Sequence, residues 1–175
     1  MTQAVVIVQT SEWSALARKL RPEALKPIVE VALQEIAAIG KPAVASKAPR
    51  FSGRLSKSVV SIIKYAGAPI PTWMSLGPKA PHRFLVERGT KPHFPPTSAD
   101  SKGGRRIRRY VRRRWGTGSD EREIARAAFR LARAISRSGT KAHPFILPAW
   151  KEIEPQVDGI LSKAAKSIEL EWLKK

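Results

Sequence analysis

The fold is decided by one stretch, SVVSIIKYAGAPIPTWMSL, which runs from Ser58 to Leu76. β-Branched residues fill its first part, Ser58–Tyr65, and favour a strand, while Thr72–Leu76 favours a second strand. Turn-forming residues lie between the two: Gly67, Pro69 and Pro71. The stretch therefore predicts an antiparallel hairpin.

Helical patterns flank the hairpin on both sides. A helix opens at Pro22, runs into Ala43–Lys47, and has apolar residues at spacings of three and four: Leu25, Ile28, Val29, Ala32, Leu33 and Ile36. A C-terminal helix is predicted from Pro148 to Leu173, and Pro155 is expected to kink it or to mark a restart. Its apolar side is formed by Ile153, Val157, Ile160, Leu161, Ala164, Ile168 and Trp172.

Shorter patterns complete the order of elements. Val5–Val8 predicts a short strand, after which Thr10 or Ser11 caps a brief helix through Leu20. Arg83–Glu87 fits a third strand or a helical turn. The order β, α, α, β, β, a basic helical pair and α predicts an α+β fold, in which a small antiparallel sheet packs with N-terminal and C-terminal helices.

The segment after the hairpin is expected to be a basic helical insertion at about residues 91–141 within a single domain, residues 1–175. Residues 91–100 are rich in proline and predict an irregular loop, which Gly103 and Gly104 end. A narrow apolar stripe then marks a basic helix: Ile107, Tyr110, Val111 and Trp115.

A second insertion helix begins with a capping-box pattern, Asp120 with Glu123, and ends at Gly139. Its buried face is predicted to contain Ile124, Ala128, Leu131, Ala132 and Ile135. Its outer face carries Arg122, Arg126, Arg130, Arg133 and Arg137.

The chain carries 33 Lys and Arg against 14 Asp and Glu, a net charge of +19. Such a charge attracts polyanions and repels other copies of the chain. Charge alone leaves nucleic acid, anionic membrane surfaces and acidic proteins open as partners. No apolar run approaches membrane-spanning length, so we expect a soluble protein made in the cytoplasm.

The densest charge lies between residues 102 and 114, where eight cations crowd together: Lys102, Arg105, Arg106, Arg108, Arg109, Arg112, Arg113 and Arg114. The planar guanidinium fork suits phosphate as well as carboxylate. Only Tyr110 and Trp115 interleave, both on the apolar side, so stacking on bases is not expected. Phosphate contact without sequence preference is the sharper hypothesis, and contact with an acidic partner subunit is the alternative.

The sequence offers no catalytic, metal-binding or cofactor-binding constellation. Cysteine is absent, which excludes thiolate zinc sites and cysteine nucleophiles. His82, His93 and His143 lack metal-ligand spacing, and Ser52 lacks the G-x-S-x-G setting of a nucleophile. We therefore expect a protein that is not an enzyme and uses no cofactor.

Three short signatures are spread along the chain: Ser52-Gly53-Arg54-Leu55 with Ser58, Leu85-Val86-Glu87-Arg88-Gly89-Thr90, and His143-Pro144-Phe145 with Pro148-Ala149. Ser52 is placed to cap one helical turn through Leu55. Gly53 and Gly89 suit tight turns in which a side chain would clash. Pro144 and Pro148 would fix the entry to the C-terminal helix, so the signatures are interpreted as parts of a scaffold.

Together with Ala48-Pro49, these signatures and their order resemble the tail-component family of long-tailed bacteriophages, also called tail-completion or head-tail joining proteins. The resemblance covers nearly the whole chain. Phe51-Ser52 stands where the family usually has Asp-Thr. Arg88 replaces the aromatic or small residue often found before Gly-Thr, although Glu87 is retained.

The resemblance implies a structural virion protein of the phage neck that forms a ring around the DNA channel, with a hexamer as the expected form. Its implied partners are the head connector or adaptor and the tail tube or tail terminator proteins, with phage genomic DNA as a further candidate. Its implied place is the virion, after assembly in the bacterial host cytoplasm. The alternative is a free protein that binds nucleic acid without sequence preference through its Arg-rich helices.

Overall fold

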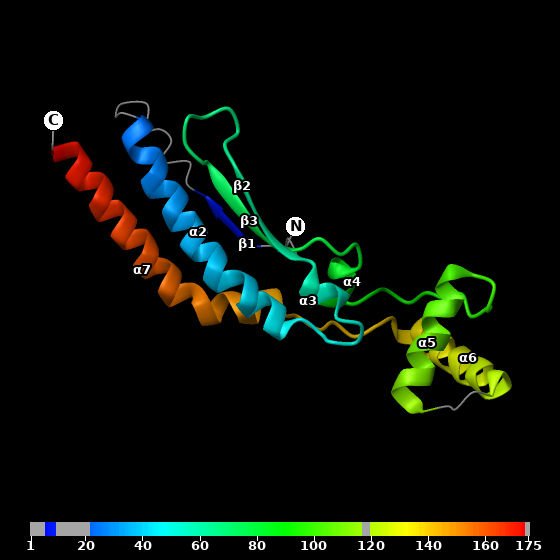
Figure 1. Ribbon diagram of the computed structural model, residues 1–175. Coiled ribbons are helices and arrows are strands. Elements are labelled where there is room, and N and C mark those ends of the chain that lie inside the picture. Colours follow the sequence, from blue (N-terminus) through cyan, green and yellow to red (C-terminus); the bar gives the residue numbers. More distant parts are fainter. Residues whose placement is uncertain (1–5, 10–21, 117–119, 174–175) are drawn as a thin grey trace. The chain divides into compact units, whose positions relative to one another are not determined.

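The computed structural model describes residues 6–9, 22–116 and 120–173 (Figure 1). The chain divides into two units. The first, here called the body, comprises Met1–Glu87 and His143–Lys175, and the second, here called the basic unit, comprises Arg88–Ala142. The chain combines helices with a small three-stranded antiparallel sheet, so the predicted α+β class is confirmed.

The body contains a three-stranded antiparallel sheet in the order β1-β3-β2. β2 spans Val59–Lys64 and β3 spans Trp73–Pro78, which confirms the predicted hairpin. β1, Val6–Gln9, pairs with the other edge of β3. Two predictions lie outside the described residues: the strand residue Val5 and the helix from Thr10 or Ser11 to Leu20.

Alternation along the strands gives the sheet two faces. Met74 and Leu76 are buried, and the register places Val8 and Ile63 beside Met74 on the same face. The opposite face, here called the outer sheet face, carries Ile7, Gln9, Val60, Ile62, Lys64, Trp73 and Ser75. Ile7 and Ile62 are 39% and 37% exposed, so the middle of this face is apolar and partly open to solvent, whereas Gln9 and Lys64 lie at its end beside Trp73.

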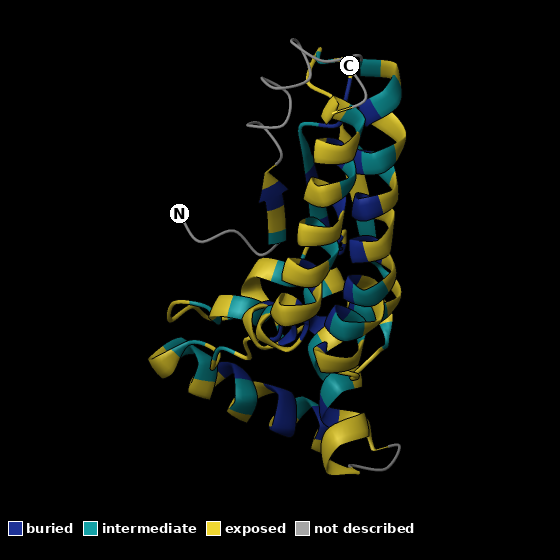
Figure 2. Cartoon of the chain, turned by 90° about the vertical axis from the view of Figure 1, so that its left-hand side faces the viewer, coloured by how far each residue is buried: buried dark blue, intermediate teal, exposed yellow. Residues whose placement is uncertain are grey.

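Two long helices cover the inner face of the sheet. α2, Pro22–Lys47, and α7, Ile146–Leu173, lie side by side and run in opposite directions (Figure 1). Figure 2 shows buried residues between the two helices and exposed residues on their outer sides. They share a core with the sheet, formed among others by Leu25, Val29, Leu33, Ile36, Ile70, Met74, Ile153 and Val157. Each such buried side chain contributes about 1.5 to 3 kcal/mol.

α7 ends at Leu173 as predicted but differs from its prediction at its start and in one residue of its apolar side. It begins at Ile146, two residues before Pro148, because the carbonyl of Phe145 already accepts a 3.2 Å hydrogen bond from the amide of Ala149. It continues through Pro155 without a restart. Trp172, predicted on the apolar side, is 58% exposed, since the buried residues of this core extend no further than Ile168.

Two short helices stand next to the hairpin strands in sequence. The predicted helical turn is present as α3, Arg54–Lys57, which continues two residues beyond Leu55, but the predicted Ser52 cap is wrong. Gly53, with φ of 68°, takes the N-cap position, and the Ser52 hydroxyl accepts only a 3.4 Å bond from the Arg54 amide. α4 spans Arg83–Arg88, which makes the undecided segment helical.

The basic unit contains α5, Lys102–Trp115, and α6, Glu121–Ser138. They pack through a small buried cluster: Val111, Ala127 and Ala128, with Ile107, Tyr110 and Leu131 around it. Gly103 and Gly104 lie in the first turn of α5 rather than ending the preceding loop. The helix begins earlier than predicted because the Ser101 hydroxyl caps it, accepting a 2.9 Å bond from the Gly104 amide.

The ends and faces of α6 follow the prediction closely. Asp120 is its N-cap and accepts a 2.9 Å bond from the Arg122 amide, and Gly139 is its C-cap. Three of the five residues predicted to be buried are so, Ile124, Ala128 and Ala132, and the other two, Leu131 and Ile135, are half-buried. Trp115 of α5 is 51% exposed rather than part of the apolar stripe, because it lies at the last residue of the helix, beyond the cluster shared with α6.

Candidate polyanion-binding surface

The basic unit carries most of the net charge of the chain. Arg88–Ala142 contains 16 Lys and Arg against 4 Asp and Glu, which gives +12 of the total +19. The body is more than twice as long and contains 17 against 10, which gives +7. Positive charge is therefore concentrated on two helices and the segments that flank them.

The eight cations predicted to contact a partner do not all point outward. Arg108 and Arg112 of α5 lie 2.9 and 2.8 Å from the two carboxylate oxygens of Glu121. The Arg108 Nε also donates to the carbonyl oxygen of Thr97 at 3.0 Å. These two arginines join α5 to α6 and to the extended segment before α5, so they contribute to the structure of the basic unit.

Helical spacing separates the remaining cations. Arg105 lies on the flank of Arg108 and donates to the carbonyl oxygen of Asp100 at 2.6 Å. Arg114 is exposed on the other flank. The side opposite the buried Val111 carries four exposed cations at spacings of four, three and four, here called the α5 stripe: Lys102, Arg106, Arg109 and Arg113.

A second stripe lies on the outer face of α6, here called the α6 stripe: Arg122, Arg126, Arg130, Arg133 and Arg137. All five arginines are exposed, and among the described residues none of them forms an ion pair. They extend over about 22 Å at the rise of an α-helix. The sequence placed these arginines on the outer face of α6 and included them in the alternative of nucleic-acid binding through Arg-rich helices.

An aromatic pair lies at the border of the α6 stripe. The rings of Phe94 and Phe129 are 5.9 Å apart at an interplanar angle of 59°. They are 53% and 51% exposed. Sequence analysis missed this pair because Phe94 precedes α5 in an irregular segment, whereas Phe129 belongs to α6.

The three sequence signatures meet in the body around one buried cluster. Leu55 of the first signature and Phe145 and Ala149 of the third are buried together, and Val86 of the second packs against them. The hydroxyl of Ser58 donates to the Leu55 carbonyl at 2.8 Å and accepts a 3.2 Å bond from the Ala80 amide. Segments far apart in the chain therefore build a single part of the core.

Glu87 links the second signature to the third. One oxygen of its carboxylate accepts hydrogen bonds from the backbone amides of Phe145 at 3.0 Å and Ile146 at 3.3 Å. These amides begin α7 and have no partner within the helix, and the helix dipole favours a negative charge there. Pro144 precedes this contact, and Pro148 occupies the first turn of α7, where a missing amide costs little.

Gly89 and Thr90 of the second signature belong to the basic unit, where they approach Thr140. The Thr90 amide donates to the Thr140 carbonyl at 3.1 Å, and the Thr140 amide donates to the Thr90 hydroxyl at 3.0 Å. Gly89 has φ of 71°, and a Cβ there would lie 2.2 Å from the Thr140 carbonyl oxygen, as the tight-turn prediction requires. At Gly53 the positive φ favours glycine, but a Cβ would meet no close atom.

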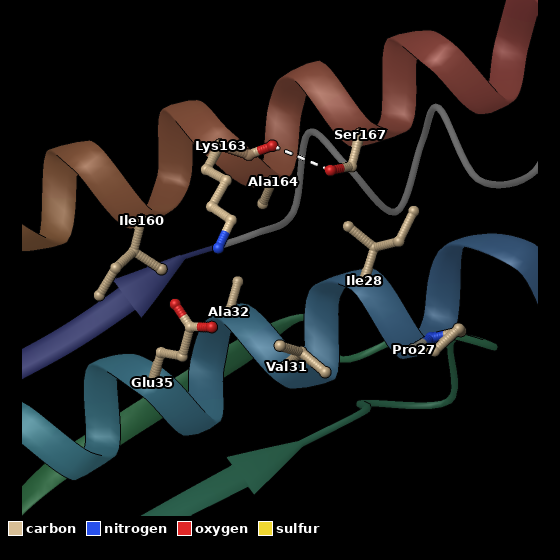
Figure 3. Close-up of a pocket in the computed structure, with 9 residues that line it drawn as sticks. All are labelled: Pro27, Ile28, Val31, Ala32, Glu35, Ile160, Lys163, Ala164 and Ser167. Carbon is tan, nitrogen blue, oxygen red and sulfur yellow. Dashed lines mark hydrogen bonds between the residues drawn. The ribbon is translucent and has the colours of Figure 1, made fainter.

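The body also has a shallow groove of about 300 Å³ between α2 and α7 (Figure 3). Its lining is mostly apolar: Pro27, Ile28, Val31, Ala32, Ile160 and Ala164. Glu35 and Lys163 point toward each other across it, and the Ser167 hydroxyl donates to the Lys163 carbonyl at 3.1 Å. The described lining contains no histidine or cysteine and offers no paired acid and base for catalysis.

No cluster of three or more His, Cys, Asp or Glu that could hold a metal ion occurs in the described parts of the chain, His82, His93 and His143 included. Among the helices that the structure describes, none is long and apolar enough to cross a membrane. The features with evident binding chemistry are thus the two cationic stripes. Whether they contact nucleic acid or an acidic protein stays a prediction.

Comparison with known proteins found no matching family model, no matching curated protein and no matching solved structure.

Proposed function

We propose that this chain is a structural protein of a phage neck, which forms a ring at the junction of head and tail and presents its basic unit to the DNA channel. The proposal rests on the resemblance carried by the three signatures. One observation supports the proposed contact of the basic unit with DNA, namely the +12 charge of Arg88–Ala142. A channel filled with phosphate groups offsets the self-repulsion that this charge creates when subunits assemble.

The convergence of the signatures supports a scaffold role. Leu55, Val86 and Phe145 share one cluster of the core, and Glu87 holds the start of α7. These residues are used for packing and capping, and none is arranged as an acid, base or nucleophile. A protein whose signatures serve its own architecture is suited to assembly rather than to catalysis.

The outer sheet face supports contact between subunits. Ile7 and Ile62 both pair with Ser75 across β3 and are 39% and 37% exposed. Apolar side chains grouped on one sheet face are stabilised when a second surface covers them. In the proposed ring, this face packs against a neighbouring subunit.

The test of assembly combines solution mass measurement with electron microscopy of the purified chain. We expect rings or ring-sized oligomers, alone or with connector and tail proteins. Ile62→Glu should reduce assembly while leaving the monomer folded, and Val31→Glu, at a 51% exposed position on α2, is the matched control. A chain that stays monomeric in the presence of connector and tail proteins would contradict the proposal. Loss of assembly only in Val31→Glu would assign the subunit contact to the exposed side of α2 instead of the outer sheet face.

The test of the α5 stripe compares two double variants with equal loss of charge. Arg106→Gln with Arg109→Gln removes outward cations, whereas Arg108→Gln with Arg112→Gln removes the Glu121 pairs. In duplex binding, the first should flatten the log affinity against log salt slope by about 2, since each phosphate contact contributes about 1. The second should mainly lower the stability of the basic unit. Equal slopes in both variants would remove the α5 stripe from phosphate contact.

The second candidate is a free protein that binds nucleic acid without sequence preference. The exposed arginines on both α5 and α6 favour it, because neither helix presents a pattern of polar side chains limited to a few base edges. This protein should bind duplex as a monomer or dimer with steep salt dependence. Tight duplex binding without any ring would support it over the neck protein.

A further inference from the structure

We infer that the α6 stripe, together with Phe94 and Phe129, is a docking surface for an acidic protein segment that carries apolar side chains among its carboxylates. This surface goes beyond the proposed phosphate contact of α5 and does not depend on it. If the chain is a neck protein, the partner is a neighbouring protein of the particle.

The first step is the uncompensated charge of the α6 stripe. Four acidic residues belong to the basic unit, and three of them have partners within it: Glu121 pairs with Arg108 and Arg112, Asp120 caps α6, and Asp100 accepts from the Ser98 hydroxyl. The fourth, Glu123, is exposed on α6 and forms no ion pair among the described residues. The five arginines of the α6 stripe are exposed and have no ion pair among the described residues. A partner that covers this face must therefore supply negative charge.

The second step is the position of the aromatic pair. Phe129 follows Arg126 by three residues and precedes Arg133 by four, so it borders the stripe on the helix surface. Phe94 packs against it, and the nearby His93 amide, donating to the Ile135 carbonyl at 3.4 Å, holds the extended segment on α6. Cationic and apolar groups thus lie next to each other on one face.

The third step is the choice of partner class. Duplex nucleic acid presents phosphate and sugar to a surface helix and keeps its base faces stacked, so it matches the arginines but leaves the phenylalanines without an apolar counterpart. An acidic amphipathic helix repeats carboxylates and apolar side chains at spacings of three and four. That repeat matches both parts of the α6 surface. The α5 stripe contains no aromatic residue, so its chemistry fits phosphate alone.

The experiment measures binding of the full chain to labelled probes by fluorescence anisotropy. The first peptide has 20 residues, with glutamate and leucine at helical spacing. The second has the same glutamates with serine replacing every leucine. We expect at least about tenfold tighter binding of the leucine peptide, which corresponds to about 1.4 kcal/mol. Phe94→Ser with Phe129→Ser should remove that advantage, and Arg126→Gln with Arg130→Gln and Arg133→Gln should weaken binding of both peptides.

Trp115→Ser is the matched control, because Trp115 is as exposed as Phe129 but lies at the end of α5. It should leave the preference for the leucine peptide unchanged. Circular dichroism checks that each variant keeps its helices, and Phe94→Ser alone, which lies outside α6, tests the aromatic contact if the double variant loses them.

Two results would overturn the inference. One is equal binding of the two peptides, or a preference that persists without both phenylalanines. The other is a Phe94- and Phe129-dependent affinity for a single-stranded oligonucleotide that exceeds the affinity for the leucine peptide, because this would assign the surface to base stacking. Neither result bears on ring formation, so the inference and the proposed function can fail separately.

Discussion

The body buries Leu33, Ile36 and Met74 completely in a core shared by two long helices and a sheet, whereas the buried cluster between α5 and α6 consists of Val111, Ala127 and Ala128. The body thus gains its stability mainly from apolar burial. In the basic unit fewer side chains are buried, Ile124 and Ala132 besides this cluster, so hydrogen bonds and ion pairs carry more of the structure.

The two units differ in how residues that stabilise the fold are distributed relative to residues that are available for binding. In the body, the sequence changes with the largest expected effect on folding lie at positions with no access to solvent. In the basic unit, neighbouring arginines on one helix divide between the two tasks, since Arg108 pairs with Glu121 while Arg109 points outward. Changes of equal charge should therefore have different consequences on the two flanks of α5.

The largest effect is expected in the body. Leu33→Ala removes a fully buried side chain between α2 and its neighbours, so it should lower the free energy of unfolding by about 2 to 5 kcal/mol. Urea unfolding followed by circular dichroism measures the change. Val31→Ala, on the exposed side of the same helix, should change the stability by less than about 0.5 kcal/mol. A similar loss in both variants would contradict the assigned core.

The next effect concerns the closure of the basic unit. Gly89→Ala forces a positive φ on alanine, at a cost of about 1 to 3 kcal/mol, and places its Cβ against the Thr140 carbonyl. The Thr90 and Thr140 amides should then exchange hydrogen faster, as measured by mass spectrometry or NMR. Gly67→Ala is the matched control, because it has φ of 77° but no atom within 4 Å. Equal hydrogen-exchange rates at Thr90 and Thr140 in both variants would mean that the close approach of Gly89 to the Thr140 carbonyl does not affect these hydrogen bonds.

A smaller effect is expected at the start of α7. Glu87→Gln keeps an oxygen that can accept from the Phe145 and Ile146 amides but removes the charge at the helix N-terminus. The free energy of unfolding should fall by about 0.3 to 1 kcal/mol. Glu152→Gln is the comparison, because Glu152 pairs with Lys47 at an exposed surface, where salt screens the pair. At high salt, Glu152→Gln should lower the free energy of unfolding by less than Glu87→Gln does. No loss in Glu87→Gln would mean that the charge at this cap is unimportant.

Sequence reasoning was successful where one segment determined the outcome. The hairpin, the faces of α2 and the caps of α6 follow from local spacing, because each depends on residues within a few turns. The contacts that join distant segments were not predicted. Phe94 meets Phe129, and Glu87 meets the amides before α7, through tertiary folding that no local pattern encodes. Gly53 took the place expected for Ser52 because a left-handed residue can begin a helix without a side-chain cap.

The smallest effect should appear as a dependence on pH in the body. The Tyr65 hydroxyl, at the end of the hairpin strand β2, donates a hydrogen bond to the Glu30 carboxylate of α2. This bond, followed by desolvation and by the Glu30 charge, raises the pKa of Tyr65 above its ordinary value of 10.0. Because the folded chain holds the proton more tightly, the contact stabilises the body fully below the ordinary pKa. Its contribution is lost as the pH rises through the raised pKa.

Absorbance titration of Tyr110→Phe isolates Tyr65, since the chain has 2 tyrosines. The midpoint should lie above 10.0 and should return toward it in the added variant Glu30→Ala. The stability advantage of the native chain over Tyr65→Phe should likewise shrink above the raised pKa. A midpoint at or below 10.0 would remove this link between β2 and α2.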